Sequence, residues 1–339
     1  MISLRNRRSG ILANRWARTR FEPADFGLVP REQLDPRRGG PETDPGLRAE
    51  RSRVADAAYE GDWRPAAAHV RAAQPADWDD RWSRLELLLQ LAASDDRWLT
   101  DWRTAEPSDA DAATVHAQQL LRRAWAVRGS AYAKDVPDGD MRQFMATLPA
   151  VMAASQRAAE LAPADPGPWV VMITAARAMS YSRGQFGDLW RNLTKRAPHH
   201  TAAHWQALQY WCAKWGGSDE AMLDFARRAA LSAPAGSTLP GIYLHALTEL
   251  RTKRPGADPA LLTAVAERLD TVREDHEDLP RLRHLLAHHL LRSGLPGAAL
   301  EQFRRIGPYC GAAPWNADPA GPVAAFDLAR GLAAHGARG

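Results

Sequence analysis

The sequence predicts an all-α protein, a right-handed superhelical solenoid of about seven antiparallel helical hairpins. The first observation behind this prediction is a shared spacing in three segments. In each, an apolar aromatic residue starts a helical stretch, a large apolar residue follows 20 positions later, and a proline falls 29 positions after the start. Two helices and their turns fill about 34–40 residues in helical repeat proteins, so each segment marks one hairpin. The segments are Trp78–Trp98–Pro107, Trp169–Leu189–Pro198 and Trp205–Phe225–Pro234.

The second observation is the choice of residues inside these segments. Small residues such as Ala176 and Ala229 allow two helices to approach closely, while large ones such as Trp205 and Phe225 fill the space between them. A single hairpin cannot bury its own apolar face, so stacked hairpins would share one continuous core. A proline after the second helix stops that helix and turns the chain.

Residues 1–45 are expected to form a basic N-terminal tail, extended or disordered, because they lack a helical period and are rich in Arg, Pro and Gly. Residues 1–20 contain six Arg and no carboxylate, so the formal net charge of +4 falls to −2 for the remainder. The body is therefore near neutral and only the tail is basic. Such a tail could contact nucleic acid or an anionic membrane.

The helical-repeat solenoid is expected over residues 46–335. Asp44 and Asp258 are suited to cap helices whose first turns hold Pro45 and Pro259. The third hairpin needs an insertion near 130–142, because the distance from its first helix to Pro163 is too long for one unit. The expected hairpins start near 46, 78, 108, 169 and 205, two more turn at 255–259 and 293–296, and a capping helix follows at 320–335.

The unit at Trp205 resembles a tetratricopeptide repeat, slightly lengthened. The matching pattern is Trp205-x-x-Leu208, then Ala221-x-x-x-Phe225, then Ala233-Pro234, whereas Gln209 and Cys212 replace the Gly-Tyr pair of that family. The resemblance implies a concave groove, lined by the first helix of each hairpin, that binds peptides or partner proteins.

Residues 110–235 are also similar to a bacterial domain family of unknown function. The resemblance implies no activity. Its motifs are Ala124-Trp125-x-x-Arg128-Gly129-Ser130, Pro163-x-Asp165-Pro166 and Lys214-Trp215-Gly216-Gly217-Ser218.

Five polar or cationic residues are the candidates for partner binding: Arg128, Arg177, Gln206, Tyr210 and Lys214. If Trp169 and Trp205 occupy tetratricopeptide positions, the last four project towards the concave side. They could bind a carboxyl terminus or acidic side chains, with arginine forming bidentate contacts; the alternative is that they are only solvated. Arg128 is either an anion receptor beside the insertion or a cap for helix carbonyls, with Gly129 at positive φ.

No catalytic, cofactor-binding or metal-binding residue is predicted. The chain has no nucleophile elbow, P-loop or dinucleotide fingerprint. The pairs His200/His204 and His284/His288 have zinc-compatible spacing but no evident third ligand, so we expect them on solvated helix faces or at helix ends. Residues 274–278 hold four carboxylates and are expected to form a plain acidic loop.

The function expected from the sequence is that of a non-catalytic, protein- or peptide-binding scaffold. A cytoplasmic location is expected, because no apolar run approaches the roughly 18–20 residues of a membrane helix and the tail lacks the apolar core of a secretory signal. One alternative is an enzyme or enzyme-accessory protein that uses Arg128 and the 130–142 insertion. Another is an adaptor that contacts nucleic acid or membrane through the basic tail.

Overall fold

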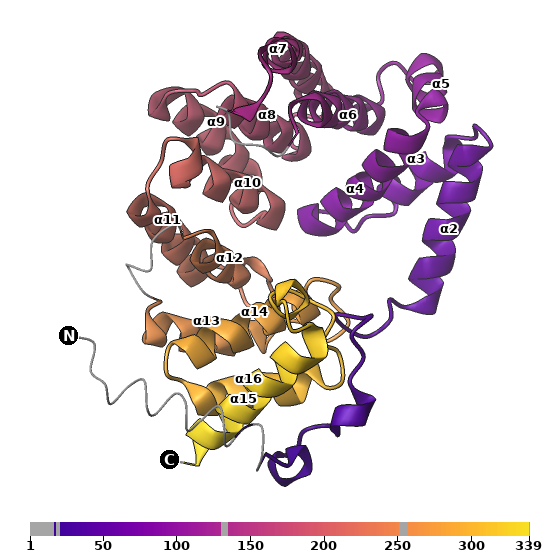
Figure 1. Ribbon diagram of the computed structural model, residues 1–339. Helices are drawn as coiled ribbons and strands as arrows, with labels where there is room; N and C mark the ends of the chain where they lie inside the picture. Colours follow the sequence, from indigo (N-terminus) through magenta and orange to yellow (C-terminus); the bar gives the residue numbers. More distant parts are fainter. Residues whose placement is uncertain (1–16, 18–20, 130–134, 251–256, 339) are drawn as a thin grey trace. The chain divides into compact units, whose positions relative to one another are not determined.

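The computed structural model describes residues 17, 21–129, 135–250 and 257–338 (Figure 1). The all-α prediction is confirmed, since the described residues form 15 α-helices and no strand, and the structure is 72% helical. The superhelical path and the number of hairpins stay predictions. Among the described helices, none has both the length and the apolar character needed to cross a bilayer.

The chain divides into two compact units. The middle unit is Asp44–Ser218, and the terminal unit combines Met1–Thr43 with Asp219–Gly339. The sequence prediction sets residues 1–45 apart as a tail, whereas residues 21–43 share a unit with the C-terminal helices. The six arginines of residues 1–20 lie outside the described residues.

Two helices of the middle unit begin at aspartate caps, and the cap at Asp44 is predicted from the sequence. Asp44 accepts a hydrogen bond from the backbone N–H of Leu47 at 2.9 Å, and Asp109 accepts one from Ala112 at 2.8 Å. Each such cap stabilises a helix by about 1 kcal/mol. The helices of this unit are α2 Pro45–Tyr59, α3 Arg64–Arg71, α4 Trp78–Ser94, α5 Arg97–Ala105, α6 Ala110–Arg128, α7 Asp138–Leu161, α8 Gly167–Ala178, α9 Arg183–Arg196 and α10 Thr201–Trp211, followed by the 3-10 helix η4 Ala213–Trp215.

The insertion predicted near 130–142 lies between α6 and α7. Its residues 130–134 are outside the described residues, and α7 begins within it at Asp138. α6 and α7 then pack along each other and enclose Phe144, Leu148 and Val151 of α7. The long α7 therefore continues the apolar core instead of extending away from it.

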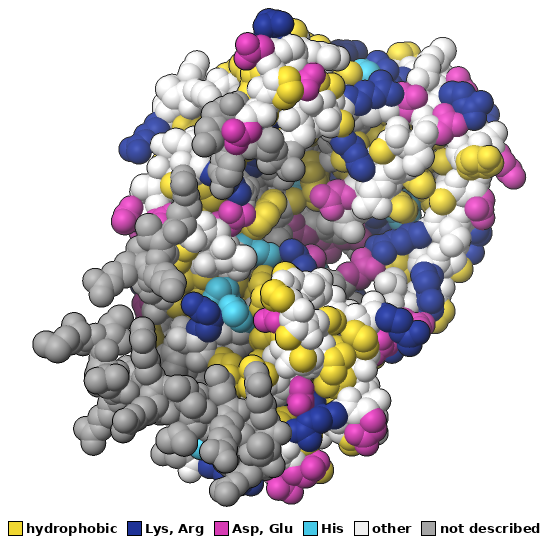
Figure 2. Space-filling view, viewed as in Figure 1, with side chains coloured by type: hydrophobic (Ala, Val, Ile, Leu, Met, Phe, Trp, Pro, Cys, Tyr) yellow, Lys and Arg dark blue, Asp and Glu magenta, His cyan; other side chains and the backbone are white. Residues whose placement is uncertain are grey.

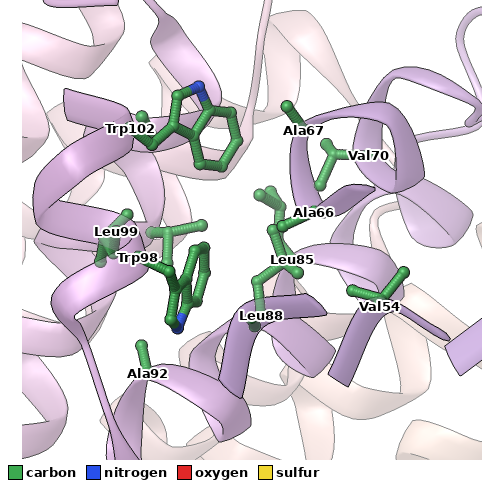
Figure 3. Close-up of a cluster of buried hydrophobic side chains, with 13 residues drawn as sticks. Val54, Ala66, Ala67, Val70, Leu85, Leu88, Ala92, Trp98, Leu99 and Trp102 are labelled. Carbon is green, nitrogen blue, oxygen red and sulfur yellow. The ribbon is translucent and has the colours of Figure 1, made fainter. Parts of the chain in front are cut away.

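The core beside α4 is built around two tryptophans of α5 (Figure 3). Trp98 and Trp102 are 1% and 0% exposed, and their rings are 6.5 Å apart. Figure 3 shows them opposite Leu85, Leu88 and the small side chains of α3. Trp98 belongs to the spacing that predicted the hairpins, and its role in packing is confirmed.

Four helices of this unit contact each other pairwise: α4 with α6, α6 with α8, α8 with α10, and α10 with α4. Asp79 of α4 makes this last connection: its carboxylate accepts hydrogen bonds from the backbone N–H and the hydroxyl of Thr201, at 2.8 and 2.9 Å. Arg81 of α4 pairs with Asp111 of α6 and, at 3.1 Å, with Asp165 before α8. Hydrogen bonds and ion pairs of charged side chains thus link the N-terminal ends of α4, α6 and α10 and the segment before α8.

In the part of the terminal unit that the structure describes, six α-helices are joined by an arm formed by residues 21–43. Asp258 caps α13 through the N–H groups of Ala260 and Leu261, and Pro259 occupies its first turn, as predicted. The helices are α11 Asp219–Ser232, α12 Ile242–Glu249, α13 Pro259–Leu269, α14 Leu279–Arg292, α15 Pro296–Ile306 and α16 Pro322–Ala337, and the short 3-10 helices are η1 Pro23–Phe26, η2 Arg31–Gln33, η5 Leu239–Gly241 and η6 Trp315–Ala317.

The arm is bonded to the helices that it crosses. The backbone N–H of Asp35 donates to the carbonyl of Pro308 at 2.8 Å, and the backbone N–H of Cys310 donates to the carbonyl of Asp35 at 3.1 Å. Arg330 of α16 is 0% exposed and donates to the carbonyl of Val29 at 2.9 Å. Residues 21–43 therefore form an ordered part of the terminal unit.

The prediction that the histidine pairs lie on solvated helix faces or at helix ends is wrong for His204 and His284. His204 and His284 lie in mid-helix and are 5% and 0% exposed. His200 does lie at a helix end, before α10, but it is 3% exposed. The helical spacing of these histidines did not reveal their burial, because a neutral imidazole whose nitrogens find hydrogen-bond partners can be buried.

Candidate partner-binding site

Two of the predicted binding residues, Arg128 and Arg177, meet on the same pair of indole rings. The guanidinium carbon of Arg128 lies 5.3 Å from the ring centroid of Trp125 and 5.2 Å from that of Trp215. For Arg177 these distances are 5.4 and 5.0 Å. The two indoles are perpendicular, with centroids 5.6 Å apart. We call these four residues the arginine–tryptophan cluster.

Three elements of the middle unit supply the cluster. Trp125 and Arg128 stand one turn apart at the end of α6, and Arg177 stands near the end of α8. Gly129 has the positive φ predicted for it, +68°, and turns the chain away from the last turn of α6. The cluster therefore lies where two helices end.

Trp215 reaches the cluster because the chain folds back after α10. The N–H groups of Gly217 and Ser218 donate to the carbonyls of Cys212 and Trp211, both at 3.1 Å. A Cβ at Gly217 would lie 1.9 Å from the carbonyl oxygen of Trp211, so only glycine fits there. This tight turn fixes the position of η4 and of the Trp215 ring within it.

The cluster is electropositive and partly withdrawn from water. Arg128 is 9% exposed, and burial lowers the pKa of its guanidinium. Arginine nevertheless stays charged at any physiological pH. Arg128 also donates to the carbonyl of Gly129, the residue directly after α6, at 3.2 Å. Each guanidinium–indole contact stabilises the cation by about 0.5–2 kcal/mol, depending on desolvation.

The other three predicted residues are placed differently. Tyr210 is buried, its ring stacks on Phe186 at 3.7 Å, and its hydroxyl donates to the carbonyl of Tyr181 at 2.9 Å. Burial raises the pKa of this hydroxyl. Gln206 is half-buried on α10, whereas Lys214 is exposed beside Trp215. Lys214 is thus a solvent-exposed cation that is adjacent in sequence to the cluster, and Tyr210 serves packing.

Sequence reasoning missed Trp125, Trp215 and Phe144 as site residues. The Phe144 ring lies 5.0 Å from Trp125 and 6.0 Å from the guanidinium carbon of Arg128. A signal was present, because Trp125 and Trp215 belong to two of the motifs within residues 110–235. Spacing along the sequence could not show that these motifs meet in space.

The cluster combines two cationic side chains with two aromatic rings. Across the described residues, no group of three or more His, Cys, Asp or Glu side chains could hold a metal ion. Among the described residues on the face shown in Figure 2, Lys and Arg side chains are interspersed with Asp and Glu.

No protein-family model, curated protein or solved structure matches the chain.

Proposed function

We propose that this chain is a non-catalytic scaffold that binds a protein or peptide bearing acidic groups at the arginine–tryptophan cluster. The supporting observation is that Arg128 and Arg177 share the indoles of Trp125 and Trp215. Guanidinium groups that are oriented before binding lose little entropy when a carboxylate arrives, because their planar donors are already aligned.

The chemistry of the cluster favours a carboxylate attached to an apolar stem. The guanidinium forks of Arg128 and Arg177 match the two oxygens of a carboxylate, and Lys214 adds a charge that is accessible to solvent. The indoles of Trp125 and Trp215 offer flat apolar surface to the methylene groups of a Glu side chain or to a neighbouring aromatic residue. A charge-assisted hydrogen bond of this kind contributes about 1.5–3 kcal/mol.

The first experiment measures the binding of a fluorescent Glu-rich peptide to the full chain by anisotropy. The same peptide with Gln in place of Glu is the ligand control. Arg177→Gln and Lys214→Glu are each expected to weaken binding about tenfold or more, which corresponds to the loss of one charge-assisted contact.

Two variants of the same unit serve as matched controls. Lys195→Glu changes an exposed lysine of α9 by the same charge. Arg183→Gln removes an arginine that lies 5.8 Å from the ring of Trp211, outside the cluster. Both controls are expected to bind like the unaltered chain. Equal affinity for the Glu and Gln peptides, or equal losses in cluster and control variants, would contradict the proposal.

A further inference from the structure

A second candidate site lies in the terminal unit, where a cleft of about 550 Å³ opens between the arm and helices α13 to α15. Pockets for small ligands usually have volumes of about 300–1,000 Å³. The cleft is lined by Gly39 and Gly40 of the arm, by apolar side chains that include Leu279 and Ile306, and by four charged side chains: Asp270, Glu274, Arg283 and Arg305. Every part of it belongs to the terminal unit.

The arm forms a fixed wall of this cleft. His284 of α14 lies within hydrogen-bonding distance of the Gly39 carbonyl, with 3.0 Å between Nε2 and the oxygen. A Cβ at Gly40 would approach Pro280 to 2.6 Å, and one at Gly39 would approach Ala312 to 2.9 Å. The two glycines therefore permit a close approach of the arm that other residues would prevent.

Two arginines line one part of the cleft, and both are paired with acidic side chains. Arg283 is 9% exposed, and its Nη1 donates to Asp270 at 3.1 Å and to the Gln302 side chain at 3.0 Å. Arg305 pairs with the same Asp270 oxygen. Glu301 lies 3.6 Å from Arg305 Nε. Two guanidinium groups thus share Asp270 at the cleft, and a ligand carboxylate could use their remaining donors.

A separate carboxylate at the cleft offers the opposite charge. Glu274 is exposed in the loop that follows α13 and lines the same cleft. It belongs to residues 274–278, the segment predicted to be a plain acidic loop. A carboxylate at this position can accept hydrogen bonds from an ammonium group.

We propose that this cleft binds a small zwitterion, a molecule with a carboxylate for Arg283 and Arg305 and an ammonium group for Glu274. Free amino acids and short peptides share this chemistry. The apolar side chains of the cleft, among them Val272, Leu279 and Ile306, would contact the aliphatic part of such a ligand. This function is independent of the arginine–tryptophan cluster, which lies in the other unit.

The test is isothermal titration of the full chain with a panel of free amino acids and of di- and tripeptides, each peptide also in N-acetylated and C-amidated forms. We expect at least one zwitterion to bind and either blocking group to weaken it about tenfold or more, as expected for one lost charge-assisted contact. Preference for peptides or for free amino acids identifies the source of the ligand. No binding of any zwitterion up to about 10 mM, or equal binding of blocked and free forms, overturns the proposal.

Two variants test the two ends of the cleft. Glu274→Gln should weaken binding of the free form about tenfold and leave binding of the N-acetylated form unchanged. Arg305→Gln should also weaken binding of the free form about tenfold and leave binding of the C-amidated form unchanged. Glu274 is exposed, so its variant tests the proposal even if Arg305→Gln fails to fold. Glu267→Gln on α13 and Arg292→Gln on α14 alter exposed residues outside the cleft and should bind like the unaltered chain.

Discussion

His284 is expected to make the terminal unit sensitive to acid. Its side chain is 0% exposed, and its two ring nitrogens have different partners. The indole N–H of Trp315 donates to Nδ1 at 2.9 Å. Nδ1 is therefore the acceptor, and Nε2 carries the proton that is donated to the carbonyl of Gly39. A second proton would have to displace the bond from Trp315.

The cost of that proton can be derived from the pKa. Burial lowers the pKa of His284 to about 4, against the opposing effect of the bond to Gly39. In the unfolded chain the pKa is near 6.5. Between these values only the unfolded chain binds the proton, so stability falls as the pH drops from about 6.5 to 4. The full loss in the free energy of unfolding is about 3 kcal/mol, and about 2 kcal/mol of it is already lost at pH 5.

The assay is urea unfolding at a series of pH values from 8 to 4.5, comparing the unaltered chain with His284→Asn. The variant should be less stable at pH 8, because it loses the bond to Gly39. Its stability should also fall less steeply below pH 6.5, since one titrating group is gone. Buried histidines such as His204 and His288, whose pKa values burial also lowers to about 4, contribute to both chains and cancel in the difference.

His335→Asn is the control, because His335 is exposed on α16 and should leave the pH dependence unchanged. The reasoning is refuted if His284→Asn and the unaltered chain lose the same free energy of unfolding between pH 8 and pH 5.

Three further changes test the packing of the middle unit. Trp102→Ala should cost about 3–5 kcal/mol in chemical denaturation because the side chain is 0% exposed, whereas Tyr59→Ala, at 80% exposure, should change stability by less than about 0.5 kcal/mol. Asp79→Ala should cost about 1–2 kcal/mol, because two hydrogen bonds to Thr201 are lost, and amide hydrogen exchange should rise at the start of α10; unchanged exchange there would contradict the assigned contact. Gly217→Ala should lower the melting temperature and weaken peptide binding at the cluster, since its Cβ would overlap the Trp211 carbonyl, while Gly184→Ala, with no atom within 4 Å, should be neutral or stabilising.

The helices could be predicted because their signals are local. The caps at Asp44 and Asp258 need only a side chain and the backbone three residues ahead. Trp98 could be assigned to the core from its spacing alone. Helical periodicity shows which residues share one face of a helix, and an apolar face is the one expected to be buried within a hairpin.

The path of the arm could not be predicted from such signals. Residues 21–43 have no helical period, yet Phe21 and Leu28 are 3% and 5% exposed. The arm's partners on α15 and α16 are separated from it by almost the whole sequence, as in the bonds from Arg304 to the carbonyl of Phe26 at 2.8 Å and from Arg330 to that of Val29 at 2.9 Å. Composition indicates a tail, and only tertiary contacts can distinguish a tail from a packed arm.

At both candidate sites a segment outside the α-helices lies against helix ends, and a glycine permits the close approach. At the cluster, Gly217 lets the chain fold back over α10 so that Trp215 reaches Arg128. At the cleft, Gly40 lets the arm lie against Pro280. A repeat pattern describes the helices and omits such segments, so it can predict the scaffold without its binding groups. If the two sites function as proposed, glycine substitutions in these segments should impair ligand binding at their own site while leaving binding at the other intact.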